Sequence, residues 1–452
     1  MIYNRIYDTF RGSPNLVKMF ANIIPINYRL GGKNFIQTYK FLQKSEMWDE
    51  EQIKKFQEKQ LKKLLEHAKN HVPYYKDVKL VNDPFRSLEN FPIIEKEIIQ
   101  EDMKKFVSDN IPRNKAYYVS TGGTSGNQLD LYLDNSTYAK EWAFVMNAWK
   151  RVGFKPGDKL ISFRGVEFKK SDKGIFWHHN PIYCMLEMSP FHLSDENLLN
   201  YIKKIKKFGP KFIHGYPSAI SILADYLERK NEQIPGIRAI LAVSENIYPW
   251  QRDKIEKTFN ARLFSFYGQS ERVIFASECE KNDQYHVYPE YGFTEIVDKN
   301  NVHTDKNGGL VGTSFLNYYM PFIRYKTGDH AQFDIDKCVC GRNHRIIKNL
   351  IGRWNQEMVI GKDNSLISVT ALNLHSNILK NIHKYQFYQD TEGVLIVRII
   401  SKEKFDATNP EKIKESLNKK TGSNLDILIE EVETIPLTKR GKHQMLIQKI
   451  KT

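Results

Sequence analysis

The sequence predicts an α/β protein with a large N-terminal domain and a small α+β domain at the C-terminus. Strands and helices alternate from about residue 140 to 270, which predicts a parallel or mixed sheet. After residue 285, short runs with Gly, Asn and Asp turns predict an antiparallel sheet or a small barrel-like β region. A third pattern begins after residue 355 and has a size at which a domain can fold alone.

We therefore divide the chain into an extension (1–45), a large domain (46–354) and a small domain (355–452). The extension contains the apolar stretch LVKMFANIIPINYRL (16–30) with basic flanks. Such a stretch suits a peripheral membrane contact or an arm packed on the main body, and Pro25 favours the arm. No run of 18 apolar residues occurs, so we expect no segment that spans a membrane.

The composition is that of a well-packed protein from a reducing compartment. Hydrophobic residues make up 41% and aromatic residues 12% of the chain, which allows a large core. Four cysteines are too few for a disulfide scaffold, and no secretory signal opens the chain. We expect a cytoplasmic protein, with a peripheral position at the inner face of the membrane as the alternative.

The charge balance favours anionic partners. Lys plus Arg number 68 against 53 Asp plus Glu, a formal net charge of +15. The lysines are scattered through amphipathic segments such as YIKKIKKFG, which we interpret as solvated helix faces. No nucleic-acid-binding signature occurs, so we expect no nucleic-acid partner.

Hydrophobic periodicity places the individual elements. The first helix covers about 49–70 and ends before Pro73. The alternating region then predicts strands within 158–165, 210–217, 237–245 and 261–271, with helices at 194–208, 218–230 and 248–259. The small domain has a helix near 370–380, strands at 384–390 and 394–400, a helix near 410–420 and a strand at 425–433. Ligands of parallel sheets bind at the carboxyl ends of the strands, where HGYP, VSEN and YGQSE lie.

The stretch YVSTGGTSGNQLDLYL (118–133) is the first candidate binding segment. It lacks the Gly-Lys-Ser/Thr of a phosphate-binding P-loop and the glycine spacing of a dinucleotide fingerprint. Its glycines let backbone N–H groups approach an anion closely, and its hydroxyls add donors. By itself the stretch is equally well explained as a surface turn.

Five stretches in order, STGGTSG, YGQSE, YKTGD, IGRWN and PLTKRGK, together resemble the adenylate-forming superfamily of acyl-CoA synthetases, adenylation domains and luciferases. The closest resemblance is to the phenylacetate-CoA ligase group, especially its CapK-like branch in polysaccharide gene clusters. QLKKLLEHAKNHVPYYKD (60–77) resembles the N-terminal helix of that branch. The resemblance extends from about residue 46 to the end and implies a mobile C-terminal domain.

The resemblance implies a site for ATP and Mg²⁺ and assigns its residues. The phosphate-gripping loop would be Ser120, Thr121, Gly122, Gly123, Thr124, Ser125 and Gly126. The family's Pro and Lys that follow this loop are here Gln128 and Leu129. Tyr267 would stack on adenine, beside Gly268; Ser270 would meet the phosphates and Glu271 would hold Mg²⁺. The adenine pocket would be lined by Ser244 and Glu245, and the ribose would be bound by Asp329 and Arg353.

The small domain would supply the catalytic Lys442, whose ammonium group would bridge the carboxylate and the α-phosphate when the domain closes. Asn355 occupies the hinge, where members of the family commonly carry Asp or Lys. His214 and Tyr216 are expected to line the acid pocket. Without the resemblance, each of these short motifs is more readily explained as a turn or a solvated segment.

Cys279, His286, Cys338 and Cys340 form the pattern C-x₆-H…C-x-C, a closed set of ligands for structural zinc. The C-x-C-G segment resembles that of zinc-bearing members of the phenylacetate-ligase group. Unrelated reduced thiols are the alternative, His344 is a substitute for His286, and Cys184 is expected in the core.

The resulting functional hypothesis is ATP-dependent activation of a carboxylic acid, followed by transfer to coenzyme A. The alternative acceptors are a carrier-protein thiol, such as that of an acyl carrier protein, and an amine, for example on an amino sugar of a surface polysaccharide. A non-catalytic, zinc-stabilised nucleotide-binding protein is the hypothesis from another class. The sequence decides neither the acid nor the oligomeric state.

Overall fold

The computed structural model describes residues 24–121, 129–165, 174–181, 183–304, 306–352, 358–369, 371–372, 374, 378, 382–401, 408–436 and 445–450. The chain forms two compact units. The first comprises Met1–Ser120, Leu129–Gly157 and Phe264–Arg353; the second comprises Thr121–Gln128, Asp158–Leu263 and Trp354–Thr452. None of the described helices combines the length and apolar character needed to cross a bilayer.

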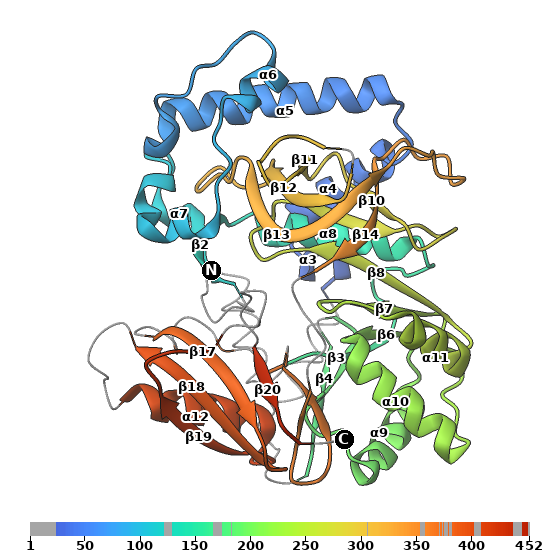
Figure 1. Cartoon of the computed structure of the whole chain (residues 1–452). Coiled ribbons are helices and arrows are strands. Elements are labelled where there is room, and N and C mark those ends of the chain that lie inside the picture. Colours follow the sequence, from blue (N-terminus) through green and yellow to red (C-terminus); the bar gives the residue numbers. More distant parts are fainter. Residues whose placement is uncertain are drawn as a thin grey trace. The chain divides into compact units, whose positions relative to one another are not determined.

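The first unit contains helices and a predominantly antiparallel sheet (Figure 1). Its α-helices are α3 (Ile26–Arg29), α4 (Gly32–Ser45), α5 (Glu50–His71), α6 (Pro84–Glu89), α7 (Lys96–Glu101) and α8 (Thr137–Lys150). Its strands are β1 (Ala116–Ser120), β2 (Asp130–Asp134), β8 (Arg262–Gly268), β9 (Phe275–Glu278), β10 (Tyr285–Val287), β11 (Gly292–Val297), β12 (Gly308–Ser314), β13 (Tyr325–Asp334) and β14 (Ile346–Ile351).

The sheet of the first unit runs in the order β11-β12-β13-β14-β10-β9-β8, while β1 and β2 form a separate hairpin. Of the two predicted arrangements for this region, the antiparallel sheet is the one found, since no pairing among the described strands closes it into a barrel. The core beneath it gathers side chains from α5, β2, β12 and β13, among them Leu64, Leu131, Leu310 and Tyr325. Helix α5 begins as predicted, with a capping box between Asp49 and Gln52.

The second unit contains a small, mainly parallel sheet and a four-stranded C-terminal sheet. The first consists of β3 (Leu160–Phe163), β4 (Trp177–Asn180), β5 (Met185–Met188), β6 (Phe212–Gly215) and β7 (Ala239–Ala242), with helices α9 (Asp195–Phe208), α10 (Pro217–Lys230) and α11 (Pro249–Phe259). The order is β7-β6-β3-β5-β4, and only the edge strand β4 is antiparallel to its neighbour. This confirms the alternating pattern read from the sequence.

The C-terminal elements are β15 (Met358–Ile360), β16 (Leu366–Ser368), β17 (Ile382–Gln389), β18 (Val394–Ser401), α12 (Thr408–Thr421), β19 (Asp426–Glu431) and β20 (Leu446–Gln448). The four-stranded sheet runs β19-β18-β17-β20, and β15 and β16 pair separately. One hydrophobic core joins both parts of the second unit, from Ile213 and Ile220 to Leu372 and Tyr385.

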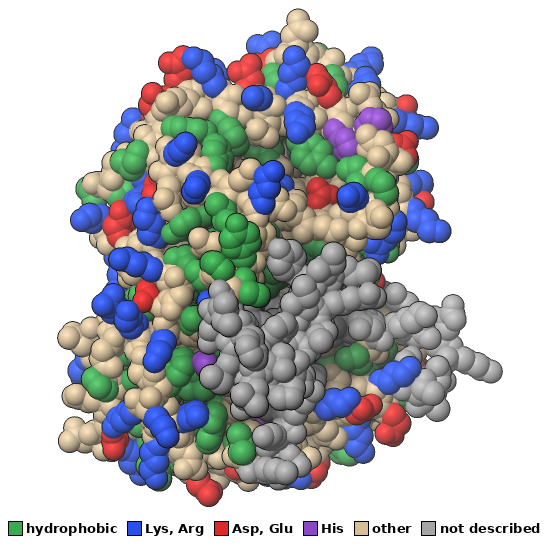
Figure 2. All heavy atoms as spheres, turned by 180° about the vertical axis from the view of Figure 1, so that it is seen from behind, with side chains coloured by type: hydrophobic (Ala, Val, Ile, Leu, Met, Phe, Trp, Pro, Cys, Tyr) green, Lys and Arg blue, Asp and Glu red, His purple; other side chains and the backbone are tan. Residues whose placement is uncertain are grey.

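Three further expectations concern Cys184, the basic side chains and a helix of the small domain. Cys184 is half-buried rather than in the core, because it lies with a left-handed φ of 53° in the turn between β4 and β5. Basic side chains on the face in Figure 2 are spread among acidic and neutral ones, as solvated helix faces require. The expected helix near 370–380 falls largely outside the described residues.

Candidate functional site

Tyr267 and Asp329, both predicted to bind the nucleoside, lie side by side in the first unit. The Tyr267 hydroxyl, on β8, donates to the Asp329 carboxylate on β13 at 2.8 Å, and it lies 3.4 Å from Thr327 Oγ1. Burial, and then the charge of Asp329, raise the pKa of Tyr267 well above its usual value. The phenol therefore stays protonated and holds one oxygen of Asp329 in place.

The Thr-Gly-Asp sequence of β13 explains how Asp329 is oriented. Tyr325, Thr327 and Asp329 alternate along β13 and are buried on the same face. The Thr327 hydroxyl donates to Leu310 O at 3.1 Å and accepts from the Asp329 backbone N–H at 3.1 Å. Gly328 has a φ of 79°, which a residue with a side chain rarely adopts. The Thr-Gly-Asp motif, which by composition resembles an ordinary turn, thus fixes the orientation of the Asp329 carboxylate.

Glu271, the predicted magnesium ligand, also contacts β13. It follows β8 after Gly268 and the half-buried Ser270, and only 5% of it is exposed. The Tyr325 hydroxyl donates to Glu271 Oε1 at 2.9 Å. Strand β13 therefore orients both carboxylates that the sequence assigned to the nucleotide and its metal ion.

Arg272 and Glu141 support this turn, and sequence reasoning did not find them. Arg272 has a left-handed φ of 57° and forms a short ion pair with Glu141 of α8. The other oxygen of Glu141 accepts from the Tyr291 hydroxyl at 2.6 Å. The partners are 131 residues apart, so no local pattern could have indicated the pair.

The predicted phosphate-gripping segment lies in the sequence between two paired strands, β1 and β2. Ser120 on β1 lies opposite Asp130 on β2 in an antiparallel pair. Ser120 is half-buried and Thr121 is 9% exposed. The other predicted loop residues and three predicted site residues lie outside the described residues: Gly122, Gly123, Thr124, Ser125, Gly126, Arg353, Asn355 and Lys442.

In the second unit, Glu245 is held by two serines. Its carboxylate accepts from the Ser218 backbone N–H at 3.1 Å, from the Ser218 hydroxyl at 3.0 Å and from the Ser368 hydroxyl at 2.6 Å. Its neighbour Ser244 is exposed and has a left-handed φ of 70°. A serine rarely adopts this backbone conformation, and such residues cluster at functional sites.

His214 and Tyr216 flank the carboxyl end of β6. His214 Nδ1 lies 2.8 Å from Leu241 O and must donate, because a carbonyl only accepts. Burial, with Arg164 nearby, lowers the pKa of His214 to about 3, so its ring is neutral. The Tyr216 hydroxyl accepts from the Gly165 N–H at 3.3 Å. Gly215 lies between them, and a Cβ there would be 2.4 Å from Phe163 O.

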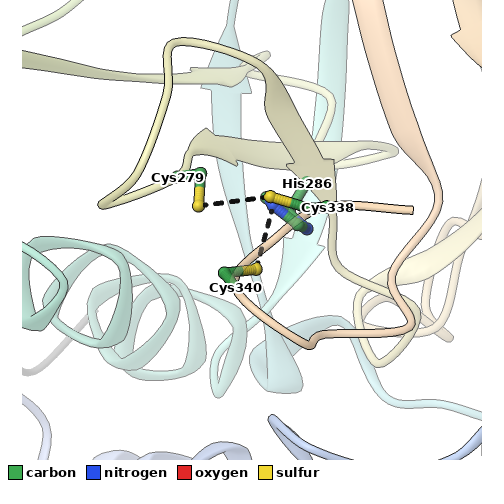
Figure 3. A group of neighbouring side chains, drawn as sticks. All are labelled: Cys279, His286, Cys338 and Cys340. Atoms are coloured by element: carbon green, nitrogen blue, oxygen red, sulfur yellow. Dashed lines mark hydrogen bonds between the residues drawn. The ribbon is translucent and has the colours of Figure 1, made fainter. Parts of the chain in front are cut away.

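The four predicted zinc ligands come together in the first unit (Figure 3). Their ligand atoms lie within 4.8 Å of one another, with Cys279 Sγ 3.6 Å from Cys338 Sγ and Cys340 Sγ 3.6 Å from His286 Nε2. Zinc–ligand bonds of about 2.0–2.3 Å imply tetrahedral edges of roughly 3.5–3.8 Å. The donor set therefore fits a zinc ion.

The protonation states and His344 refine this fit. Burial lowers the pKa of His286 to about 3, so the ring is neutral, as metal binding requires. Burial raises the pKa of Cys279 to about 12, so its thiolate needs a nearby cation. The alternative ligand His344 is not a member of the group, and its ring centroid lies 6.0 Å from that of His286.

Arg342, which the sequence did not single out, secures the loop that carries two of the cysteines. Its guanidinium contacts Glu46 at 2.7 Å, at the end of α4, and Glu280 at 2.7 Å, beside Cys279. In addition, Asn343 Nδ2 donates to Trp48 O at 3.0 Å. The segment between α4 and α5 is thus bound to the cysteine loop.

The sequence is similar to those of several known proteins. A family model described as the CapK C-terminal domain matches residues 359–449. The chain is 27% identical to Protein CapK of Staphylococcus aureus over 372 residues, covering 81% of each chain. It is 25% identical to phenylacetate-coenzyme A ligase of Thermus thermophilus, over 69% of this chain and 72% of that protein.

Two further similarities extend the comparison. The chain is 22% identical to fumarate–(S)-2,3-diaminopropanoate ligase of Enterobacter agglomerans, over 70% of this chain and 78% of that protein. A crystal structure of 2-hydroxyisobutyryl-CoA ligase with 2-HIB-AMP and CoA superposes with a TM-score of 0.57 and 17% identity, covering 89% and 91% of the two chains. This structural likeness shows a shared fold.

Proposed function

Because the chain is an adenylate-forming ligase, homologous to CapK and to the phenylacetate-coenzyme A ligases, we propose that it activates a carboxylic acid with ATP. A carboxylate oxygen would attack the α-phosphorus, the bond to the β-phosphate would break, and pyrophosphate would leave. The product would be an acyl-adenylate. The hydrogen bond between Tyr267 and Asp329 is the observation that carries this proposal, since it prepares an oriented carboxylate for ribose hydroxyls.

The remaining residues have distinct tasks in this proposal. Glu271 would hold Mg²⁺, which neutralises phosphate charge when it is bound. Ser120 to Gly126 would bind phosphate oxygens, with Ser270 beside them, while Ser244, Glu245 and Arg353 would contact the nucleoside. Lys442 would bridge the reacting carboxylate and the α-phosphate, and Asn355 would act as the hinge that brings it there and away again. The acid would lie near His214 and Tyr216.

The decisive experiment detects the intermediate itself. Purified enzyme is incubated with ATP, Mg²⁺ and each of a panel of carboxylic acids, and acyl-AMP is measured by mass spectrometry and by trapping with hydroxylamine. The proposal predicts acyl-AMP and stoichiometric pyrophosphate with at least one acid. ATP binding without acyl-AMP from any acid would instead support a nucleotide-binding protein that does not catalyse.

The acceptor is a second question for the same assay. Thioester formation by coenzyme A is the leading proposal, because several relatives are named coenzyme A ligases. Transfer to an amine is the alternative, favoured by the relative named as a ligase of fumarate with a diamino acid. Coenzyme A, a phosphopantetheinylated carrier protein and amino sugars, added in turn to preformed acyl-AMP, distinguish these acceptors by their products.

Cys279, His286, Cys338 and Cys340 would hold a structural zinc ion, since four protein ligands leave no open coordination position. Metal analysis of the purified protein tests this role. One zinc per chain, lost in Cys338→Ser and retained in Cys184→Ser, is the expected result. A metal-free protein with unchanged thermal stability would leave the three cysteines as unrelated thiols.

A further inference from the structure

A row of polar side chains crosses the parallel sheet of the second unit near its carboxyl edge. Glu187 on β5 is paired with His178 on β4 and with Ser162 on β3, and Ser162 is paired with His214 on β6. Paired residues of neighbouring strands project to the same face of a sheet. The four side chains therefore lie in one row, one residue before the ends of β3, β5 and β6.

The opposite face of these strands is apolar. The residues on either side of the row in the sequence, Ile161, Phe163, Leu186, Met188 and Ile213, belong to the hydrophobic core of the unit. Each of the three buried strands, LISF, MLEM and FIHG, thus carries a polar residue at its third position: Ser162, Glu187 and His214. Burying polar groups costs free energy unless they are well paired, so these side chains need partners in the fold or in a ligand.

Glu187 is the charged member of the row and is held firmly. It is 5% exposed, yet Asn180 Nδ2 donates to its Oε1 at 3.2 Å and His178 Nε2 makes a short contact with its Oε2. His178 is the more exposed partner, with 26% of its side chain accessible. Both partners come from the edge strand β4, which therefore orients a buried carboxylate on the face of the sheet.

His214 marks the other part of the row. Its ring is neutral and its Nδ1–H is committed to Leu241 O. It is separated from Glu187 by two strand spacings, about 10 Å in a sheet of ordinary geometry. A small organic acid lying along the row could therefore pass His214 with one end and reach Glu187 with the other.

We propose that this row is the specificity surface of the acid site, and that Glu187, oriented by His178, selects acids carrying a hydrogen-bond donor distant from the reacting carboxylate. The inference rests on the proposed activation of a carboxylic acid. The donor is a hydroxyl or an ammonium group, since a carboxylate accepts from either. An apolar acid would leave Glu187 without this partner, and sites built to bond a polar group strongly reject analogues that lack it.

The test compares matched acids on the full-length enzyme. Straight-chain acids of four to eight carbons are each supplied as the parent acid, the ω-hydroxy acid and the ω-amino acid, and kcat/KM is measured from pyrophosphate release. We expect at least a tenfold preference for one donor-bearing series over its parent. Glu187→Gln should abolish most of a preference for amino acids but retain part of a preference for hydroxy acids, because the amide oxygen still accepts.

Controls separate recognition from folding. Glu196→Gln, an exposed carboxylate in the first turn of α9, should leave the preference unchanged. His178→Gln changes the half-exposed partner and provides a second variant if Glu187→Gln does not fold. If both variants lower the melting temperature without altering the preference, or if the wild type shows no preference, the inference is overturned. Absence of activity with every acid would instead overturn the proposed function.

Discussion

Tyr267 and Asp329 are joined by a 2.8 Å hydrogen bond between β8 and β13, and this pair connects two motifs 62 residues apart. The hydrogen bond holds one oxygen of the Asp329 carboxylate in place and links the Tyr267 ring on β8 to β13. A pre-oriented carboxylate costs less entropy when it binds two hydroxyls, which is the task assigned to Asp329. The proposed nucleotide site should therefore be sensitive to substitution at either residue.

Asp329→Ala should raise the KM for ATP about tenfold or more, because hydrogen bonds to charged groups contribute about 1.5–3 kcal/mol each. Tyr267→Phe removes only the bond that orients Asp329 and should have a smaller effect in the same direction. Pyrophosphate release at varied ATP concentration measures both. His330→Ala, at an exposed position next along β13, is the matched control, and an equal effect there would contradict the assignment.

Arg342→Ala should destabilise the first unit by about 3–5 kcal/mol, because it leaves the carboxylates of Glu46 and Glu280 without their shared cation. Arg342→Lys should be intermediate, since a single ammonium group cannot reproduce the planar fork. Chemical denaturation measures the loss. Lys337→Ala removes an exposed ion pair with Glu50 from the same loop and should cost less than about 1 kcal/mol. Similar losses in both variants would contradict the role of Arg342.

Glu290 should make stability depend on pH. It is fully buried, and burial raises its pKa to about 7, while the Ser45 hydroxyl donates to one oxygen. The folded chain therefore favours the neutral carboxyl, and the resulting stability is complete below the unfolded pKa of about 4.3 and is lost as pH rises through 7. As the pH rises from 4 to 8, the free energy of unfolding of Glu290→Gln should therefore increase relative to that of the wild type by up to about 3 kcal/mol.

Unfolding by denaturant across that pH range tests the prediction. Glu58→Gln changes an exposed carboxylate on α5 and should leave the pH profile of the wild type intact. A Glu290→Gln variant whose stability falls with pH in parallel with the wild type would show that another group titrates.

Much of the fold followed from local signals. The sequence predicted α5, α9, α10 and α11 because each has an apolar stripe or a cap that local rules recognise, such as Ser194 before α9. It gave no such stripe for α8, in which buried residues surround the helix, including Glu141 and Asn147. The hairpin of β4 and β5 was missed because Trp177–Asn180 lacks the apolar alternation of a strand.

The site followed from resemblance more than from local chemistry. By composition, Thr-Gly-Asp at 327–329 predicts only a turn. The orientation of Asp329 depends on Tyr267, which is distant in the sequence and lies nearby only in the folded chain. The gathering of Cys279, His286, Cys338 and Cys340 was anticipated from their spacing, C-x₆-H followed by C-x-C, and their role as zinc ligands stays a prediction. The row containing Glu187 was not predictable, since strand register determines which residues share a face.

The most direct test of adenylate formation is acid-dependent exchange of labelled pyrophosphate into ATP, measured for the wild type, Lys442→Ala and the neighbouring control Lys439→Ala. The account predicts exchange with at least one acid, a loss of about 100-fold or more in Lys442→Ala and little change in Lys439→Ala. Exchange that persists in Lys442→Ala at the wild-type rate, or that no acid supports in the wild type, would contradict it.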